Sequence, residues 1–124
     1  MYTVTVTTNF TAGHQLNFAA VPEPYHIHDW LVETAVIGSQ LNETGLLIDF
    51  NKLKKILSDI TTPFSDQTLE DFDCFKDNST SAENVAKYIF SSAKKQLPED
   101  VSLLYVEVTE APGCKARYSE IPVQ

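Results

Sequence analysis

The segment from His26 to Gly38, with the sequence HIHDWLVETAVIG, decides the fold expected for this chain. It is rich in β-branched and aromatic residues and ends at a glycine, which is typical of a strand. The segment from Tyr2 to Phe10 alternates apolar or β-branched residues with Thr and Asn, which indicates a second strand with one buried face. We predict that the two strands are antiparallel and that residues 17–25, which include two prolines, form the loop between them. His14 is then expected just past the end of the first strand.

The rest of the sequence predicts two helices and two more strands. Asp49 and Ser81 are suitable helix caps, and apolar residues recur at helical spacing after Asp49. Residues 61–80 are acidic and lack periodic apolar positions, so we predict a loop with one short turn. The expected elements are helices over residues 50–60 and 81–97 and strands over residues 101–109 and 116–118. This order is typical of an α+β fold with two helices on one face of a four-stranded antiparallel sheet.

The composition is that of an ordinary globular protein. The chain has 124 residues, of which 43% are hydrophobic and 21% charged, so we expect one domain over residues 1–124. The formal net charge of -8 argues against a nucleic-acid partner, because binding to phosphates requires a basic face. There is no membrane-spanning apolar run and no signal-peptide pattern at the start, so we expect a cytoplasmic protein without a membrane partner. Cys74 and Cys114 match no metal-ligand spacing or disulfide framework.

All three histidines of the chain lie within a short stretch, as His14, His26 and His28. Residues two apart on a strand point to the same face, so His26 and His28 should present their imidazoles side by side. His14, from the neighbouring strand, would complete a site with three nitrogen ligands. Three imidazoles and one open position are the arrangement of catalytic zinc. The alternative is a hydrogen-bonded histidine cluster that holds no metal.

Five short motifs, in the right order, resemble the superfamily of 6-pyruvoyltetrahydropterin synthase and 6-carboxytetrahydropterin synthase over nearly the whole chain. The first two are the family's Phe-x-Ala-x-His-x-Leu and His-Gly-His patterns, which correspond to Phe10–Leu16 and to His26-Ile-His28, where Ile27 replaces the glycine. The remaining matches are Gly45-Leu-Leu-Ile-Asp-Phe50, Ser81-Ala-Glu-Asn84, and Glu110-Ala111 followed by Tyr118. Ordered motifs in a consistent structural context support such a match.

The resemblance implies the tunnelling fold, in which the sheets of several subunits form a β-barrel, usually in a homohexamer built as a dimer of trimers. It implies that His14, His26 and His28 bind Zn²⁺ and that a pterin is the small-molecule substrate. It also implies that Glu110 holds the pterin ring, because the two oxygens of a carboxylate can accept hydrogen bonds from two parallel N–H donors. A closed barrel would also protect the sheet edges.

The sequence departs from the family at the positions that transfer protons. The usual base is a cysteine shortly before His-x-His, but this chain has Glu23 there, which resembles a divergent subfamily that cleaves the side chain of dihydroneopterin triphosphate. A carboxylate in an apolar loop can serve as a proton acceptor, so Glu23 is the candidate base. Of the family's later Asp-His pair, Asp66 is retained and Gln67 replaces the histidine. Glutamine cannot shuttle a proton.

The leading hypothesis is therefore a zinc-dependent lyase that acts on a dihydropterin side chain, with Glu23 and Asp66 as catalytic residues. The reaction would serve folate or another pterin pathway. A second possible lyase reaction is that of 6-carboxytetrahydropterin synthase in deazaguanine (queuosine) biosynthesis. This chain lacks the cysteine that this reaction uses. The main alternative from another class is a pterin- or purine-binding oligomer that keeps the metal but has lost proton transfer, which Gln67 favours and Glu23 opposes.

Overall fold

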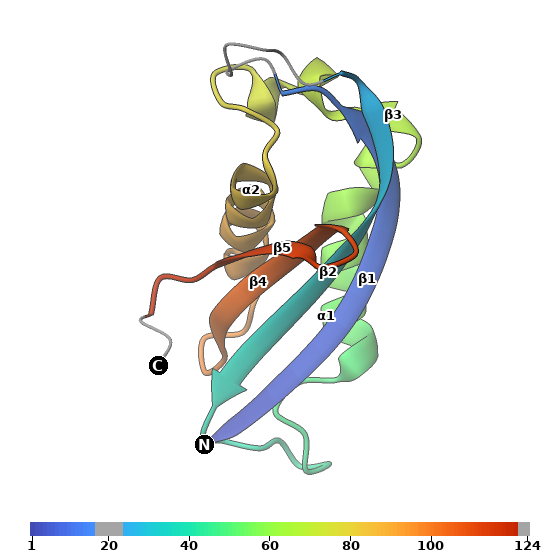
Figure 1. Ribbon diagram of the computed structural model, residues 1–124. Coiled ribbons are helices and arrows are strands. Elements are labelled where there is room, and N and C mark those ends of the chain that lie inside the picture. Colours follow the sequence, from blue (N-terminus) through green and yellow to red (C-terminus); the bar gives the residue numbers. More distant parts are fainter. Residues whose placement is uncertain (17–23, 122–124) are drawn as a thin grey trace.

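The computed structural model describes residues 1–16 and 24–121 and contains one five-stranded sheet (Figure 1). The strands are β1 (Tyr2–His14), β2 (His26–Gly38), β3 (Gln67–Thr68), β4 (Ser102–Ala111) and β5 (Cys114–Tyr118), in the spatial order β3-β1-β2-β4-β5. All neighbouring pairs are antiparallel except β1 with β3, which is parallel. The long β1–β2 pair runs without a register shift from Tyr2 opposite Gly38 to His14 opposite His26.

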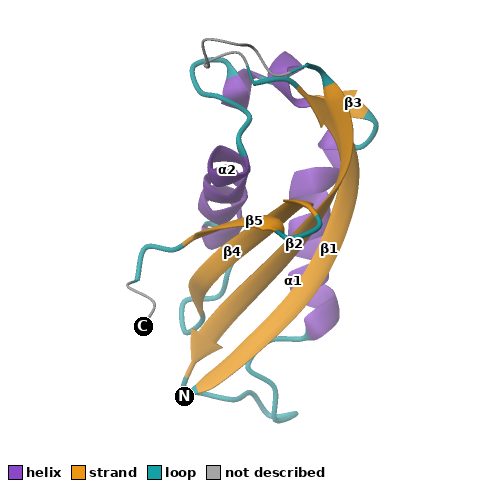
Figure 2. Cartoon of the chain, viewed as in Figure 1, coloured by secondary structure: helices purple, strands orange, loops and turns teal. Residues whose placement is uncertain are grey.

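Two helices, α1 (Phe50–Thr61) and α2 (Ala82–Lys94), pack against one face of the sheet (Figure 2). Helix α1 lies against β1, and α2 lies against β4 and β5. Each helix begins as the sequence predicts. The side chain of Asp49 accepts a hydrogen bond from the Asn51 amide, and the side chain of Ser81 accepts one from the Asn84 amide. No helix in residues 1–16 and 24–121 is long and apolar enough to span a membrane.

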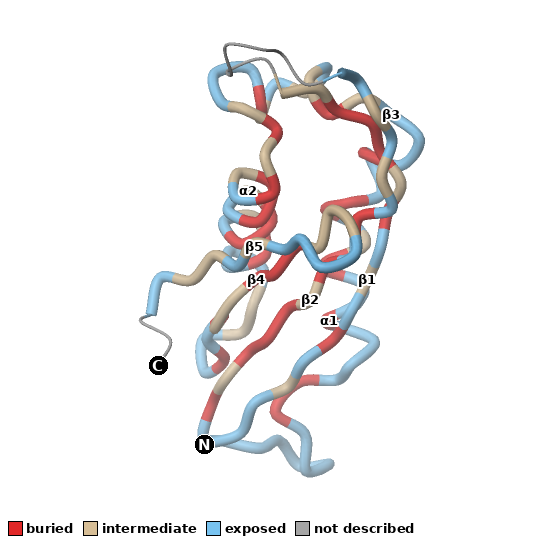
Figure 3. Tube along the Cα trace, viewed as in Figure 1, coloured by how far each residue is buried: buried red, intermediate tan, exposed pale blue. Residues whose placement is uncertain are grey.

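The hydrophobic core fills the space between the sheet and the helices, and Figure 3 shows buried segments on both. Alternate residues of β2 point into it, and each large apolar side chain that is fully buried stabilises the fold by roughly 1.5–3 kcal/mol. The largest fully buried apolar side chains include Trp30, Phe64, Phe90, Leu53 and Leu57. These buried residues fix which face of β1 and β2 is turned toward the helices. Side chains at the strand ends that continue the same alternation therefore point to that face.

The α+β architecture predicted from the sequence is confirmed, but two local predictions were wrong. Strand β1 continues to His14 rather than ending at Phe10, because Ala12 and Gly13 still pair with β2 and are buried. Residues 61–80 are more ordered than an acidic loop with one turn. They contain three short 3-10 helices, Thr62–Phe64, Leu69–Asp71 and Asp73–Phe75, and the fifth strand β3. Buried Phe64, Leu69 and Phe75 hold this segment against the core.

Thr34 places a hydroxyl group in the hydrophobic core. Thr34 is fully buried on β2 between Val32 and Val36, and its Oγ1 has no hydrogen-bond partner among the described residues. Burying a hydroxyl without a partner costs about 1–3 kcal/mol in proteins. We expect Thr34→Val to raise the free energy of unfolding by about 1 kcal/mol in chemical denaturation, because valine has nearly the same shape. Thr5→Val, at an exposed position of β1, should change it by less than about 0.5 kcal/mol. A less stable Thr34→Val variant would mean that the hydroxyl is satisfied.

Candidate metal centre

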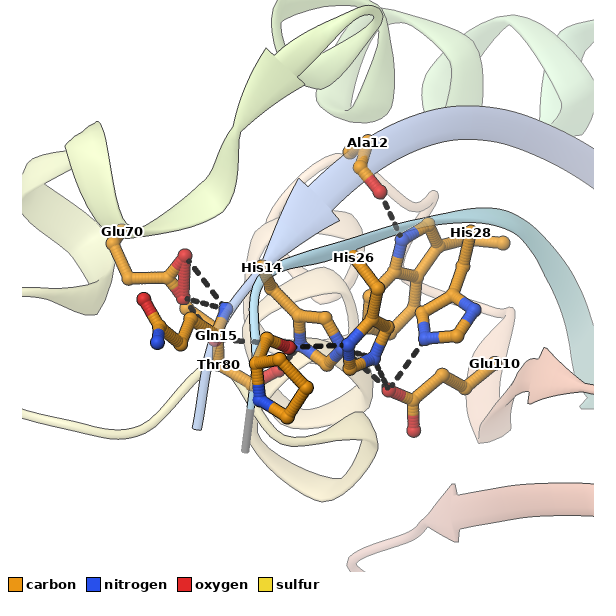
Figure 4. Close-up of polar contacts among 10 residues, drawn as sticks. Ala12, His14, Gln15, His26, His28, Glu70, Thr80 and Glu110 are labelled. Atoms are coloured by element: carbon orange, nitrogen blue, oxygen red, sulfur yellow. Dashed lines mark hydrogen bonds and ion pairs between the residues drawn. The ribbon is translucent and has the colours of Figure 1, made fainter. Parts of the chain in front are cut away.

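Four side chains from three neighbouring strands meet on the helix-covered face of the sheet. His14 ends β1, His26 and His28 begin β2, and Glu110 lies near the end of β4 (Figure 4). His14 pairs directly with His26 in the β1–β2 register, and His28 lies two residues further on the same face. The prediction that the strands bring the three imidazoles together is therefore confirmed.

The candidate ligand atoms of these four residues lie within 4.8 Å of one another. The Nε2 atoms of His14 and His26 are 3.1 Å apart, and Glu110 Oε1 lies 2.5 Å from His14 Nε2 and 3.3 Å from His28 Nε2. In a tetrahedral zinc site with bonds of about 2.1 Å, neighbouring ligand atoms are about 3.4 Å apart. The distances among the four atoms lie on both sides of this value, from 2.5 Å up to 4.8 Å, and three imidazoles with one carboxylate are ligand types that suit zinc.

The rings of His14 and His26 are oriented by backbone carbonyls. The Nδ1–H of His14 donates to the carbonyl oxygen of Thr80 at 2.8 Å, and the Nδ1–H of His26 donates to that of Pro24 at 2.7 Å. Because a carbonyl only accepts, Nδ1 carries the proton in both rings. In the neutral form of each ring, Nε2 then carries the lone pair and points into the cluster, which is the tautomer that a metal ligand requires.

Trp30 forms the floor beneath the histidines. It is fully buried, and its indole N–H donates to the carbonyl oxygen of Ala12 at 3.1 Å. The rings of His14 and His28 stand edge-on to it, with centroids 4.9 and 5.8 Å away. His14 is itself completely buried, whereas the side chains of His26 and His28 are 28% and 20% exposed. The site is therefore enclosed by the core on the side of Trp30 and His14. It is partly open to solvent on the side of His26 and His28.

Glu110 lies on the same face of β4 as the buried Val106 and Val108, at an irregularity in the sheet. The β4–β5 register shifts between Thr109 and Ala111, so Glu110 has no partner across the strand pair. Such bulges often redirect a side chain next to a functional site. The tight β4–β5 turn that follows requires Gly113, which has a φ of +79°.

The first residues of β2 are held by a close contact on the opposite face. The Tyr25 ring covers Gly13, where an added Cβ would lie 1.9 Å from the Tyr25 hydroxyl oxygen. That hydroxyl is also 3.0 Å from Thr68 Oγ1 in β3. Only glycine at position 13 leaves space for this contact, which ties β1, β2 and β3 together directly beside His14 and His26.

The remaining predicted site residues lie elsewhere. Glu23 falls outside the described residues. Asp66 is exposed and has a positive φ of 59°, and its amide donates to the carbonyl oxygen of Thr11 at 2.7 Å, so it is not part of the four-residue cluster. Gln67 follows it in β3 and pairs with Ala12. Asp29 follows His28 in β2, points to the opposite face, and accepts a hydrogen bond from the Thr11 hydroxyl at 2.8 Å.

The sequence did not single out two residues that support His14. Thr80 precedes the Ser81 cap of α2 and supplies the carbonyl described above, and Glu70 accepts hydrogen bonds from Thr80 and Gln15. A backbone carbonyl carries no sequence signal, and Glu70 belongs to a segment that looked like an acidic loop. Only the packing of residues 61–80 brings both of them to the site.

The face of the sheet opposite the helices carries a charged network on β4 and β5. Arg117 donates to Glu107 at 2.9 Å and stacks over the ring of Tyr105 at 3.7 Å. The hydroxyl of Tyr105 donates to Glu33 at 2.7 Å. Burial, followed by this hydrogen bond, raises the pKa of Tyr105 above its usual value. The polar side chains of this face are therefore held in place by contacts with one another.

Comparisons with known proteins agree with the fold and the motifs. A family model described as 6-pyruvoyl tetrahydropterin synthase matches residues 3–121. Among solved structures, the chain is similar to 6-pyruvoyl tetrahydropterin synthase from Caenorhabditis elegans, with a TM-score of 0.82, 24% identity and coverage of 97% of this chain and 96% of that one. A catalytic-residue mutant of the Plasmodium vivax enzyme gives a TM-score of 0.76 and 16% identity, with coverage of 94% and 96%.

An uncharacterized protein from Wolinella succinogenes is also similar, with a TM-score of 0.78, 14% identity and coverage of 97% and 98%. No curated protein sequence matches the chain. The architecture is the tunnelling fold that the sequence motifs predicted. Since the family model covers nearly all of its length, this chain belongs to the 6-pyruvoyl tetrahydropterin synthase family.

Proposed function

We propose that this protein is a zinc-dependent lyase that acts on the side chain of a dihydropterin, with dihydroneopterin triphosphate as the first substrate to test. One observation supports this most strongly. The Nε2 atoms of His14 and His26 and the imidazole of His28 converge in a chain that matches the 6-pyruvoyl tetrahydropterin synthase model almost completely. The lyase activity of the family is therefore the chemistry that the site is best equipped to perform.

The cluster fits a zinc ion in the nature of its ligands, their spacing and the tautomers fixed by Thr80 and Pro24. When bound, zinc would supply a Lewis acid for the oxygens of the substrate side chain. His14, His26 and His28 would hold the ion. Their partly exposed side, formed by His26 and His28, leaves room for the substrate to approach.

Glu23 is the proposed base that removes a proton from the substrate side chain. Pro24, the next residue in the chain, contacts the ring of His26. The Plasmodium vivax mutant supports the assignment, because in that enzyme the residue replaced by alanine is a glutamate described as catalytic. Asp66 is the second proposed catalytic residue. Since it is exposed and outside the cluster, it would act on a substrate group away from the metal.

Glu110 is the proposed anchor of the pterin ring. Its carboxylate lies against the histidine nitrogens and is 22% exposed, so it is reachable from the open side of the site. A pterin that binds there would meet a carboxylate able to accept two parallel hydrogen bonds from its amino and ring N–H groups. Its Oε1 lies 2.5 Å from His14 Nε2 and 3.3 Å from His28 Nε2, so this oxygen would help the three histidines to hold a metal in the absence of substrate.

The direct test is to incubate the zinc-loaded protein with dihydroneopterin triphosphate and to identify the products by chromatography. Release of 6-hydroxymethyldihydropterin would establish the reaction attributed to Glu23. A different cleavage product would place the chain in another branch of pterin or deazaguanine metabolism.

The second candidate function is a pterin- or purine-binding oligomer that keeps the metal site but lacks turnover. Gln67 favours it, because glutamine stands where the family has a proton-transferring histidine. In the same experiment, this candidate predicts a pterin that stays bound and is recovered unchanged. Turnover by the wild-type protein would exclude it.

We expect Glu110→Ala to weaken pterin binding by about tenfold or more, since hydrogen bonds to a charged group contribute roughly 1.5–3 kcal/mol each. The zinc content at saturating metal should remain near that of the wild type, because the three imidazoles are retained. Fluorescence titration with the pterin and metal analysis measure the two effects. Glu43→Ala, at an exposed position between β2 and α1, is the control. Unchanged pterin affinity in Glu110→Ala would remove Glu110 as the anchor.

We further propose that the protein works as a cytoplasmic homohexamer, a dimer of trimers. Beyond the short β3 pairing at Ala12 and Gly13, the outer edge of β1 has no strand beside it in the part of the chain that the structure describes. The outer edge of β5 likewise has no neighbouring strand among the described residues. Pairing these edges between subunits would protect both of them and close a barrel. Sedimentation analysis tests this, and a monomeric mass would overturn it.

A further inference from the structure

Glu70 lies behind the metal centre, in the short 3-10 helix Leu69–Asp71, and its carboxylate is directed toward His14 (Figure 4). Leu69 beside it is fully buried and fixes this turn against the core. The carboxylate oxygens accept the Gln15 amide at 3.2 and 3.1 Å and the Thr80 hydroxyl at 2.5 Å. Glu70 therefore binds two residues that are far apart in the sequence.

Both residues that Glu70 contacts determine the position of His14. Gln15 follows His14 in the chain, and Thr80 supplies the carbonyl that accepts from His14 Nδ1 at 2.8 Å. Thr80 is 2% exposed and His14 is 0% exposed, so the contact between them is shielded from water, and the contacts of Glu70 with Thr80 and Gln15 are partly buried. A hydrogen bond to a charged acceptor in such surroundings is stronger than one between neutral groups.

We propose that Glu70 is a positioning residue for the metal site, which holds His14 through Thr80 on one side and Gln15 on the other. The proposal rests on the metal site of the proposed function, and it adds a residue that touches neither the metal ligand atoms nor the substrate. Glu70 holds Thr80 through its hydroxyl, the carbonyl of Thr80 keeps the proton of His14 on Nδ1, and His14 Nε2 is left to bind the metal. Groups that orient a metal ligand in this way typically contribute 10–100-fold to metal affinity.

The test uses the metal alone and requires no substrate. Zinc affinity is measured by competition with a chromophoric chelator for the wild type and for Glu70→Ala, Glu70→Gln and Asp71→Ala. We expect Glu70→Ala to weaken zinc binding by about 10–100-fold. Glu70→Gln keeps an acceptor oxygen and should lie closer to the wild type. Asp71→Ala removes the same charge from an exposed position of the same turn and should leave the affinity unchanged.

A second readout separates positioning from a general loss of stability. The visible absorption bands of bound Co²⁺ depend on ligand geometry, so they should shift in Glu70→Ala and remain unchanged in Asp71→Ala. The thermal unfolding of each metal-free variant gives its stability. Wild-type zinc affinity and a wild-type Co²⁺ spectrum in Glu70→Ala would overturn the proposal, whatever its melting temperature. Failure of the wild type to cleave dihydropterin would contradict the lyase function but would leave these metal measurements interpretable.

Discussion

We expect the Glu23→Gln variant to lose turnover of the dihydropterin substrate by about 100- to 10,000-fold, the usual contribution of a general base. Glutamine has nearly the same size as glutamate and can still accept a hydrogen bond, but it cannot take up a proton. The substitution leaves the three histidines and Glu110 untouched. The zinc content and the affinity for the pterin should therefore remain close to those of the wild type. Single-turnover measurements on zinc-loaded protein give the rate of the chemical step.

Glu99→Gln is the matched control for this variant, because it makes the same chemical change at an exposed position before β4. It should turn over substrate at the wild-type rate. Equal turnover in Glu23→Gln would remove Glu23 from the mechanism and direct attention to Asp66. Loss of turnover together with loss of zinc would instead mean that Glu23 supports the metal site.

The second large effect is expected from the His26→Ala variant, in which zinc affinity should fall by about 100-fold or more. Loss of a group that only orients a ligand lowers metal affinity by about 10–100-fold. Loss of the ligand itself should therefore lower the affinity by at least the upper limit of this range. Turnover should fall with the bound metal. His26 is 28% exposed, so its removal leaves no large cavity in the core and the fold should persist. Chelator competition measures the affinity, and circular dichroism confirms that the sheet is intact.

Ile27 offers the control for this prediction within the same strand. It lies between His26 and His28, points to the opposite face and is 65% exposed. Ile27→Ala should keep the wild-type zinc affinity. If His26→Ala bound zinc as tightly as Ile27→Ala, the cluster would be a hydrogen-bonded group of histidines and the assignment of a metal site would be wrong.

Much of the site was predictable because strands have a simple periodicity. The spacing of His26 and His28 put both on one face of β2, and the antiparallel partner brought His14 opposite His26. The helix caps at Asp49 and Ser81 were also predictable, because a cap is a local interaction between a side chain and a nearby amide. The role assigned to Glu110 came from motif resemblance, and the structure adds that its carboxylate reaches the histidines.

Other features depend on long-range packing that no local pattern encodes. The extension of β1 to His14 follows from pairing with β2, and the turn that carries Glu70 is ordered because buried Leu69 and Phe75 anchor its segment. The sequence by itself determined the α+β class, the three histidines and their common face, since these follow from periodicity and composition. Only the tertiary structure brought Glu70 and Thr80 behind His14, because contacts between residues 66 positions apart arise from the packing of the whole core.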